Sequence, residues 1–221
     1  MRIRPVGAHA LLLDCAAPHD GGAALVEAWR AELWRRREQG ELIATEIVPA
    51  ASTVLLDGVP DPAATADLLS RWAGTLPASP NDGAASRMSG DDLSEGAGVV
   101  VPVQFDGPDL PVVAEHWGTD VPTVLHRLTG TPFRVAFCGF APGFPYLTGL
   151  PAELALPRLA TPRPRVPAGS VALAGPYAGI YPGASPGGWL LVGRTDLVLF
   201  DVHAEPPALL GPGTPVRLAA A

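Results

Sequence analysis

The chain contains no lysine, and all 15 basic residues among its 221 residues are arginines. A phosphate-binding P-loop ends in Lys followed by Ser or Thr, so the Gly187-Gly188 pair does not belong to such a loop. A biotinylated lysine is also excluded, and any biotin carrier would have to lie elsewhere. The lack of lysine therefore removes one nucleotide-binding loop and one cofactor attachment from the functions open to this chain.

An excess of positive charge is also missing, because the formal net charge is −7 and the isoelectric point is about 5.1. Non-specific nucleic-acid binding needs a basic face, which this composition argues against. No run approaches the roughly 18–20 apolar residues of a membrane span, and no secretory segment follows Met1. We expect a soluble cytoplasmic protein that binds neither nucleic acid nor membranes.

The residues that usually carry metal or nucleophile chemistry are few and scattered. Cys15 and Cys138 each lie in an apolar run, which predicts two buried free thiols. The five histidines are dispersed without an HExxH spacing, so no metal site is predicted. There is no GxSxG nucleophile elbow and no GxGxxG loop after a strand. The sequence lacks a self-contained hydrolase motif.

Hydrophobic residues make up 48% of the chain, enough for a sizeable core. Residues 1–76 are predicted to form a small α+β domain with the order βαββα. With one more strand this would be a ferredoxin-like split βαβ layer. The predicted strands are 9–15, 42–49 and 53–57, and the predicted helices are 23–39 and 61–74, the second with Asp61 as N-cap and Pro62 at its first position.

Residues 77–98 are rich in Ser, Gly, Asp and Ala and are predicted to be a flexible linker or loop. Residues 99–221 then alternate short apolar runs with Gly/Pro turns, which favours a closed or nearly closed β-barrel. The predicted strands are 99–105, 133–138, 170–174, 189–192, 197–202 and 215–218. Two short helices, 110–117 and 120–129, are predicted to be capped by Asp109 and Thr119.

Residues 133–196 contain ten glycines and ten prolines threaded with apolar side chains, a pattern typical of ordered loops that frame a surface. Within it, residues 141–146 predict either a rigid aromatic lip that presents Phe144 and Tyr146 or a tight turn of the barrel. Arg163 and Arg165 lie on an extended Pro-rich segment, and arginine suits the capture of carboxylate or phosphate. Surface solubility is the alternative role for these two arginines.

Other candidate site residues each have a structural alternative. Ser170 can donate a hydrogen bond to a ligand or close a turn, and Trp189 favours a core position. His126 lies on the second helix of this half, where a half-buried histidine is the default and a general acid or base the alternative. The further candidates, from aromatic and rigid-turn motifs, are Tyr181, Ser185 and Arg194.

Three motifs carry a resemblance to a known family: FCGFAPGFPYLxGL at 137–150, PRxxxPRPRVPAGSVALAG at 157–175 and GIYPxxSPGGWxLxGRT at 179–195. With them, the chain resembles the KipI/allophanate-hydrolase-subunit family. The GPDL segment within 105–110 and His126 also match the family pattern. The departures are Gly7-Ala8-His9-Ala10, where the family has a G-D-x-A turn, and Gln104-Phe105, where it often has Cys-Tyr.

The resemblance implies a cyclophilin-like β-barrel for the second domain and a subunit of an ATP-dependent 5-oxoprolinase. In that family the chain works with a homologous C subunit and a LamB/YcsF-like A subunit, which together open a lactam to glutamate using ATP. Phosphorylating the amide oxygen would make the lactam a better electrophile, and nearby arginines would offset the developing charge. Arg163, Arg165 and Arg194 are candidates for that role, with Tyr146, Ser170 and Ser185 as hydrogen-bonding groups.

Three other functions stay open at this point. The chain resembles a sporulation kinase inhibitor of the same family, which implies a binding protein without chemistry. It also resembles half of the carboxyltransferase region of urea carboxylase. Prolyl isomerisation is suggested only by the barrel type, and fold analogy alone is weak support for a function.

Overall fold

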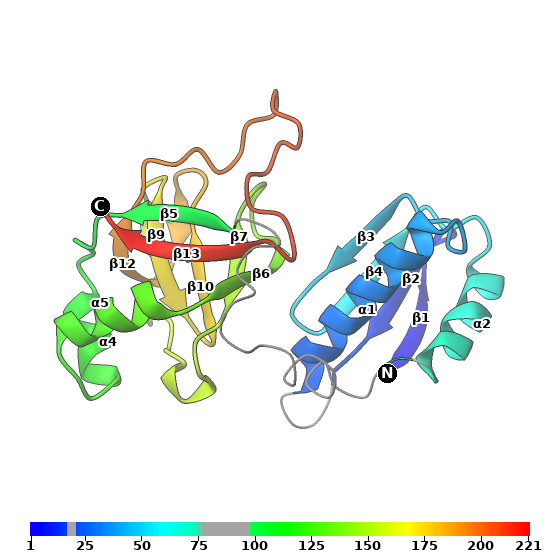
Figure 1. Ribbon diagram of the computed structural model, residues 1–221, viewed down its shortest axis with the longest axis horizontal. Helices are drawn as coiled ribbons and strands as arrows, with labels where there is room; N and C mark the ends of the chain where they lie inside the picture. The colour runs from blue at the N-terminus through cyan, green and yellow to red at the C-terminus, as the bar shows by residue number, and fades with distance from the viewer. Residues whose placement is uncertain (17–20, 75, 77–97) are drawn as a thin grey trace. The chain divides into compact units, whose positions relative to one another are not determined.

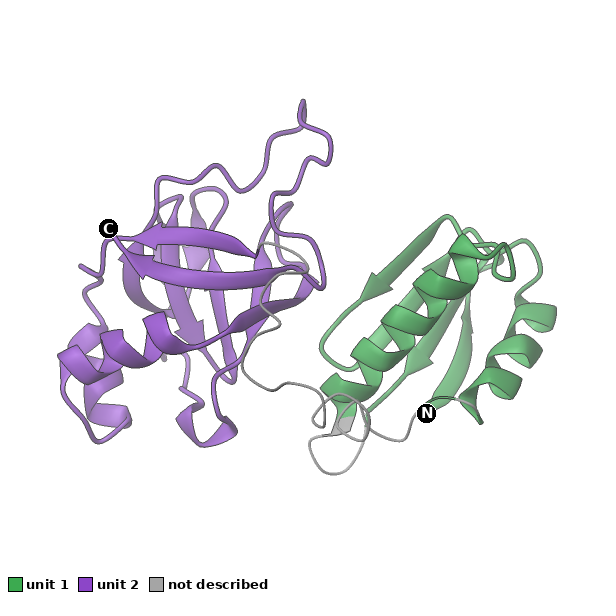
Figure 2. Cartoon of the chain, viewed as in Figure 1, with its two compact units in different colours: residues 1–95 green, residues 96–221 purple. Residues whose placement is uncertain are grey.

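A computed structural model of the chain describes residues 1–16, 21–74, 76 and 98–221. The chain divides into two compact units, residues 1–95 and 96–221 (Figure 2). The predicted linker 77–98 lies outside the described residues, except for Gly98.

The first unit is a four-stranded antiparallel sheet with two helices (Figure 1). Its strand order in space is β1-β2-β4-β3. The elements are β1 (Arg2–Val6), β2 (Ala10–Asp14), α1 (Gly21–Glu38), β3 (Glu46–Pro49), β4 (Thr53–Asp57) and α2 (Pro62–Ala73). Because β4 lies between β2 and β3 and is antiparallel to both, the two strands joined by α1 are parallel and separated by a third.

The observed element order is ββαββα, one strand more than the predicted βαββα. The additional strand, β1, comes at the start of the chain and pairs with β2. Its residues alternate arginine with apolar groups and contain Pro5, and most are exposed, so the hydrophobic pattern was too weak to reveal a strand. The ferredoxin-like description of this unit stays a prediction.

One face of this sheet carries both helices. Leu11 and Leu13 of β2 and Val54 and Leu56 of β4 share a single buried cluster with residues of both helices. The helix residues in that cluster are Val26, Trp29, Leu33, Leu69 and Trp72. The predicted start of the second helix is confirmed, because the Asp61 carboxylate accepts a hydrogen bond from the Ala64 N–H and Pro62 begins the helix.

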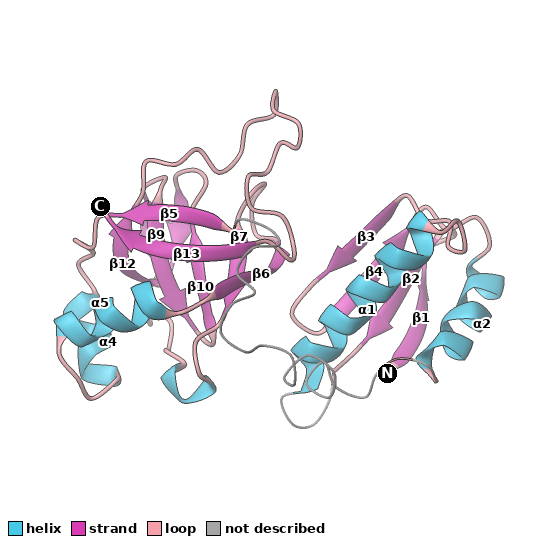
Figure 3. Cartoon of the chain, viewed as in Figure 1, coloured by secondary structure: helices cyan, strands magenta, loops and turns pink. Residues whose placement is uncertain are grey.

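The second unit is built on a seven-stranded sheet in the order β12-β9-β10-β7-β6-β13-β5. These strands are β5 (Val99–Val103), β6 (Phe133–Cys138), β7 (Pro145–Thr148), β9 (Ser170–Ala174), β10 (Tyr177–Ile180), β12 (Leu190–Arg194) and β13 (Pro215–Ala220). A second sheet pairs β8 (Arg163–Val166) with β11 (Ser185–Gly187). Two helices, α4 (Leu110–His116) and α5 (Val121–Gly130), lie against each other beside the barrel (Figure 3).

The outer strands of the large sheet meet at one bridge. Gln104, after β5, and Arg194, at the end of β12, exchange both backbone hydrogen bonds, with N···O distances of 2.8 and 2.9 Å. The sheet is therefore a nearly closed barrel, as predicted. Its interior is filled mainly by aliphatic side chains from the strands and loops, together with Val113 of α4 and Val124 and Leu128 of α5.

The predicted strands 133–138 and 170–174 match β6 and β9, whereas the predicted strand 197–202 is wrong. That segment makes only an isolated bridge, between Phe200 and Ala208. Four short strands of three or four residues, β7, β8, β10 and β11, escaped prediction because Gly and Pro interrupt their apolar runs.

Both predicted helix caps of this unit need correction. The cap of α5 is Asp120 rather than Thr119, because the Asp120 carboxylate accepts the Thr123 N–H at 2.9 Å. Asp109 does occupy the N-cap position of α4, but its side chain makes no capping hydrogen bond there.

Two further predictions concern the thiols and membrane association. Both cysteines are free, as predicted; Cys15 is buried and Cys138 is half-buried. Within the described ranges, no helix is long and apolar enough to cross a membrane.

The bridge that closes the barrel leaves no room for a side chain at Gly193. A Cβ atom there would lie 2.5 Å from the Gln104 carbonyl oxygen and 2.8 Å from a methyl group of Val103. We expect Gly193→Ala to lower the free energy of unfolding by about 1–3 kcal/mol, the usual cost of overpacking. Gly183→Ala is the matched control, since no atom lies within 4 Å of its Cβ position. Equal stability of the two variants in urea unfolding would contradict this role of Gly193.

Candidate functional site: an aromatic pocket on the outer face of the barrel

Strand β9 is buried on both of its faces. Val171 and Leu173 point into the barrel core, while Ala172 and Ala174 belong to a separate cluster on the other face. Successive side chains of a strand point to opposite faces, so this second cluster covers the outside of the barrel. The small alanines leave space there for large rings.

Phe144 lies at the centre of this outer cluster and is 1% exposed. Its ring centroid is 5.1 Å from those of Tyr146 and Tyr181, 5.5 Å from that of Trp189 and 5.4 Å from that of Phe140. The pairs are tilted or edge-to-face, the geometry that aromatic quadrupoles favour. The rings therefore form one rigid, packed surface.

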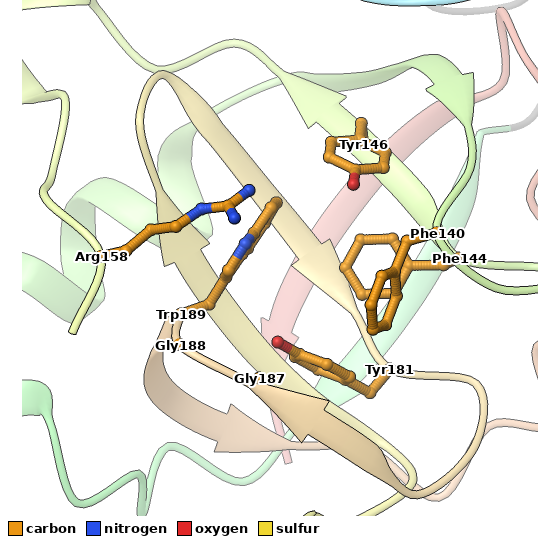
Figure 4. Close-up of a pocket in the computed structure, with 8 residues that line it drawn as sticks. All are labelled: Phe140, Phe144, Tyr146, Arg158, Tyr181, Gly187, Gly188 and Trp189. Atoms are coloured by element: carbon orange, nitrogen blue, oxygen red, sulfur yellow. The ribbon is translucent and has the colours of Figure 1, made fainter. Parts of the chain in front are cut away.

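A small pocket of about 70 Å³ opens among these rings (Figure 4). In Figure 4 the Tyr146 hydroxyl points towards the space between Trp189 and Phe144, and the Tyr181 hydroxyl points towards Trp189. The described residues that line the pocket are Phe140, Phe144, Tyr146, Arg158, Tyr181, Gly187, Gly188 and Trp189. Arg158 is the only charged residue in that set, so the lining is electropositive.

The backbone on both sides of Arg158 is held in place. Leu156 exchanges two backbone hydrogen bonds with Gly175, at 2.7 and 3.0 Å, and the Leu159 N–H donates to the Gly188 carbonyl at 2.7 Å. The Arg158 guanidinium lies 6.0 Å from the centroid of the Trp189 ring. It makes no hydrogen bond or ion pair with any residue that the structure describes, so its donors are available to a ligand.

The Tyr181 ring is almost fully buried, and Gly187 makes room for its hydroxyl. A Cβ atom at Gly187 would lie 2.3 Å from that oxygen. Burial raises the pKa of Tyr181, and the positive charges of Arg158 and Arg163 oppose the shift only partly. The phenol is therefore protonated at neutral pH and can donate a hydrogen bond.

Phe140 is an exposed aromatic residue with a strained backbone. Its φ is +68°, and the Ala141 N–H donates to the Gly139 carbonyl at 2.8 Å, which closes a γ-turn centred on Phe140. The γ-turn with positive φ is the rare, strained form, and a positive φ is an outlier for a bulky residue. Such strain is concentrated at functional sites, where the surrounding structure maintains it.

A half-buried ion pair between Arg163 and the buried Asp109 lies next to the pocket. Nη2 of Arg163 lies 2.7 and 2.8 Å from the two carboxylate oxygens of Asp109, whose side chain is 9% exposed. The same carboxylate accepts the Leu191 N–H at 2.6 Å, and Nη1 of Arg163 donates to the Trp189 carbonyl at 3.3 Å. The pair therefore connects the start of α4 to β8 and β12 and fixes the backbone of Trp189.

The structure brings together three of the predicted site residues: Phe144, Tyr146 and Tyr181 all line the pocket. Of the two alternatives for residues 141–146, a lip that presents Phe144 is not seen, because Phe144 is the buried centre of the cluster and Phe140 is the ring that protrudes. The six other predicted residues are not among the described lining residues.

Among those six, the guanidinium of Arg163 is engaged by Asp109, and Arg194 makes an exposed ion pair with Asp106. Arg165 is exposed on β8, and His126 is exposed on α5 rather than half-buried.

The two serines lie elsewhere in the second unit. Ser170 is buried in β9, opposite Arg194 in the strand register. The hydroxyl of Ser185 in β11 is buried without a hydrogen-bond partner among the described residues.

The sequence analysis did not name Arg158 or Phe140 as site residues, and it assigned only a core position to Trp189. Arg158 and Phe140 lie inside the motifs that carry the family resemblance, and this was the only feature of the sequence that pointed to them. Across the described ranges, no group of three or more His, Cys, Asp or Glu side chains is placed to hold a metal ion.

Comparison with known proteins identifies the family. Residues 1–210 match the family model of the carboxyltransferase domain, subdomains C and D. The chain belongs to this family. The match covers the first unit and the second up to residue 210, so the outer pocket lies within the family's domain.

Curated relatives include two proteins named as the B subunit of 5-oxoprolinase. The protein of Escherichia coli O157:H7 is 49% identical over 122 residues, which are 54% of this chain and 56% of the relative. The protein of Bacillus subtilis is 43% identical over 122 residues, covering 54% and 51% of the two chains. The matched stretch thus spans about half the length of these relatives.

Solved structures resemble the whole chain. TTHA0988 superimposes with a TM-score of 0.71 at 34% identity, over 97% of this chain and 40% of TTHA0988. PH0987 from Pyrococcus horikoshii gives a TM-score of 0.54 at 30% identity, over 100% and 97% of the two chains. Kluyveromyces lactis urea carboxylase shares the fold, with a TM-score of 0.63 at 18% identity over 99% of this chain and 21% of that protein.

The burial of Asp109 predicts a large effect of removing its partner Arg163. Arg163→Ala leaves the Asp109 carboxylate buried without its counter-ion, which costs about 3–5 kcal/mol in comparable pairs. Arg194→Ala is the matched control, because it breaks the exposed pair with Asp106, and such pairs contribute about 1 kcal/mol or less. Urea unfolding of both variants measures the difference. Equal losses would show that the pair between Arg163 and Asp109 has no special structural role.

Buried tyrosines predict a loss of stability at alkaline pH. Burial raises the pKa of both Tyr177 and Tyr181 above the ordinary value of about 10. The folded state therefore holds these protons more tightly than the unfolded state does. Their contribution to stability is complete below about pH 10 and is lost as the pH rises through the folded-state pKa values. Urea unfolding between pH 8 and 11 should show this decline, and the double variant Tyr177→Phe/Tyr181→Phe should flatten it.

Proposed function

We propose that the chain is a subunit of an ATP-dependent 5-oxoprolinase, which opens the lactam of 5-oxoproline to glutamate. The observation that carries the proposal is the 43–49% identity to relatives named as the B subunit of 5-oxoprolinase. An electropositive, aromatic pocket on the outer face of the barrel supports it, because the substrate is a small ring that carries a carboxylate.

Opening this lactam needs activation, because an amide is a poor electrophile. Phosphorylation of the amide oxygen by ATP would make the lactam carbon a better electrophile, and positive charges nearby would stabilise the charge that develops. The guanidinium groups of Arg158 and Arg165 make no ion pair with the described residues and are candidates to assist. Arg194 is engaged by Asp106 at the surface and would first have to exchange that partner.

The pocket is too small to hold the nucleotide. Pockets for drug-sized ligands have volumes of roughly 300–1,000 Å³, whereas this pocket has about 70 Å³. None of its described lining residues is Asp, Glu or His, the usual general acids and bases. Both points favour a chain that binds substrate while a homologous C subunit and a LamB/YcsF-like A subunit supply ATP binding and the rest of the chemistry.

The family match favours one alternative, in which the chain is half of a carboxyltransferase like that of urea carboxylase. The matched model describes a carboxyltransferase domain, and the fold is shared with the Kluyveromyces lactis enzyme. Because the chain has no lysine, a biotinylated partner would then be required. Binding to a kinase without chemistry is the other outcome to be tested.

The test is reconstitution. The chain is purified, mixed with the products of neighbouring genes that encode the C-type and LamB/YcsF-like subunits, and assayed for glutamate and ADP together. We expect glutamate formation from 5-oxoproline that needs ATP and all three proteins, and none from the chain alone. Absence of turnover in the assembled mixture, or carboxyl transfer from a biotinylated protein instead, would contradict the proposal. Retention of a kinase by the chain would favour the binding-protein alternative.

A further inference from the structure

We propose that the pocket around Arg158 is a carboxylate-recognition site for a small cyclic acid, and that it leaves the amide of the substrate outside for the partner subunits. This inference rests on the proposed function and assigns the charge-pairing role to Arg158, in place of the arginines that the sequence suggested.

The charge of the pocket selects an anion. Arg158 is its only charged described lining residue and makes no ion pair in the described part of the chain, whereas Arg163 and Arg194 already bind Asp109 and Asp106. A guanidinium group offers a planar set of donors that matches a carboxylate. The backbone hydrogen bonds of Leu156 and Leu159 fix the backbone on either side of Arg158. Figure 4 shows the Arg158 guanidinium beside the Trp189 ring.

The uncharged lining residues suit the second carboxylate oxygen of a ligand and the carbon that carries the carboxylate. Tyr146 belongs to β7 and Tyr181 directly follows β10, and the hydroxyls of both lie near the Trp189 ring (Figure 4). A protonated phenol can donate to a carboxylate oxygen. The exposed ring of Phe140 and the ring of Trp189 offer apolar surface to a ligand ring at the entrance.

The size of the pocket decides which end of the ligand enters. Its volume of about 70 Å³ is several-fold below the roughly 300–1,000 Å³ of pockets that enclose drug-sized ligands. We therefore assign the carboxylate and its neighbouring carbon to the inner part of the pocket, with the rest of the ring at the open side. The ring and its amide would therefore project beyond Phe140, where a second protein could reach the amide oxygen.

This arrangement makes a specific prediction about ligands. A cyclic acid without a lactam, such as cyclopentanecarboxylate, should bind the full chain, whereas 2-pyrrolidinone, a lactam without an acid group, should not. Saturation-transfer NMR with each compound and with 5-oxoproline measures this directly. Arg158→Met should weaken the binding of both acids roughly 10- to 100-fold, as expected for the loss of a charge-assisted hydrogen bond.

Arg217→Met is the matched control, because Arg217 is exposed on β13 and does not line the pocket. It should leave the affinity for both acids unchanged. Thermal unfolding should show that Arg158→Met folds like the unchanged chain, since Arg158 is exposed and makes no ion pair with the described residues.

Three outcomes would overturn the inference: no saturation transfer to 5-oxoproline at millimolar concentration, binding of 2-pyrrolidinone as strong as that of the acids, or equal binding by Arg158→Met and Arg217→Met. A variant Arg158→Met that keeps its acid binding but no longer assembles with the other subunits would assign the pocket to a partner side chain instead.

Normal KM for 5-oxoproline in a complex that contains Arg158→Met would refute the inference and leave the proposed function intact. Failure of the reconstituted complex to turn over refutes the proposed function, while the NMR experiment still reports on the pocket.

Discussion

The ion pair between Asp109 and Arg163 is the contact on which the site depends. It joins residues 54 positions apart in sequence, and the same carboxylate also accepts the Leu191 N–H. Through the Trp189 carbonyl it sets the position of one wall of the pocket. Such a pair adds little net stability, but the buried Asp109 carboxylate cannot be left without its partner except at a large cost. It therefore fixes the relative positions of α4, β8 and β12.

The two faces of the barrel sheet have different roles: the inner face forms the hydrophobic core, and the outer face carries the candidate binding site. The barrel interior is filled mainly by aliphatic side chains, whereas the outer face of β9, β10 and β12 carries the aromatic cluster and the pocket. The γ-turn at Phe140 and the hydrogen-bonded segment around Arg158, whose Leu156 is part of the interior cluster, place their side chains at the rim of the pocket. The chain can thus present a binding surface while the chemistry is supplied by other proteins.

Sequence patterns predicted much of the fold, because alternating or continuous apolar runs such as 133–138 and 170–174 report burial directly. The site was harder to predict. Arg158 and Arg163 stand in the same Pro-rich stretch, and nothing local tells which of them meets a carboxylate, since Asp109 is brought to Arg163 only by the tertiary fold. The burial of Phe144 was missed for the same reason, because it depends on rings from distant parts of the sequence, such as Tyr181 and Trp189.

Strand β9 is covered by the barrel core on one face and by the aromatic cluster on the other, which restricts the substitutions that it tolerates. Val171 and Leu173 are confined by the barrel core, and Ala172 and Ala174 lie beneath large rings, so a bulkier or polar replacement has no free side to occupy. β13 differs, because Arg217 faces water on one side of the strand. Natural drift and directed evolution of this protein should therefore spare β9 and accumulate instead on strands with a solvated face.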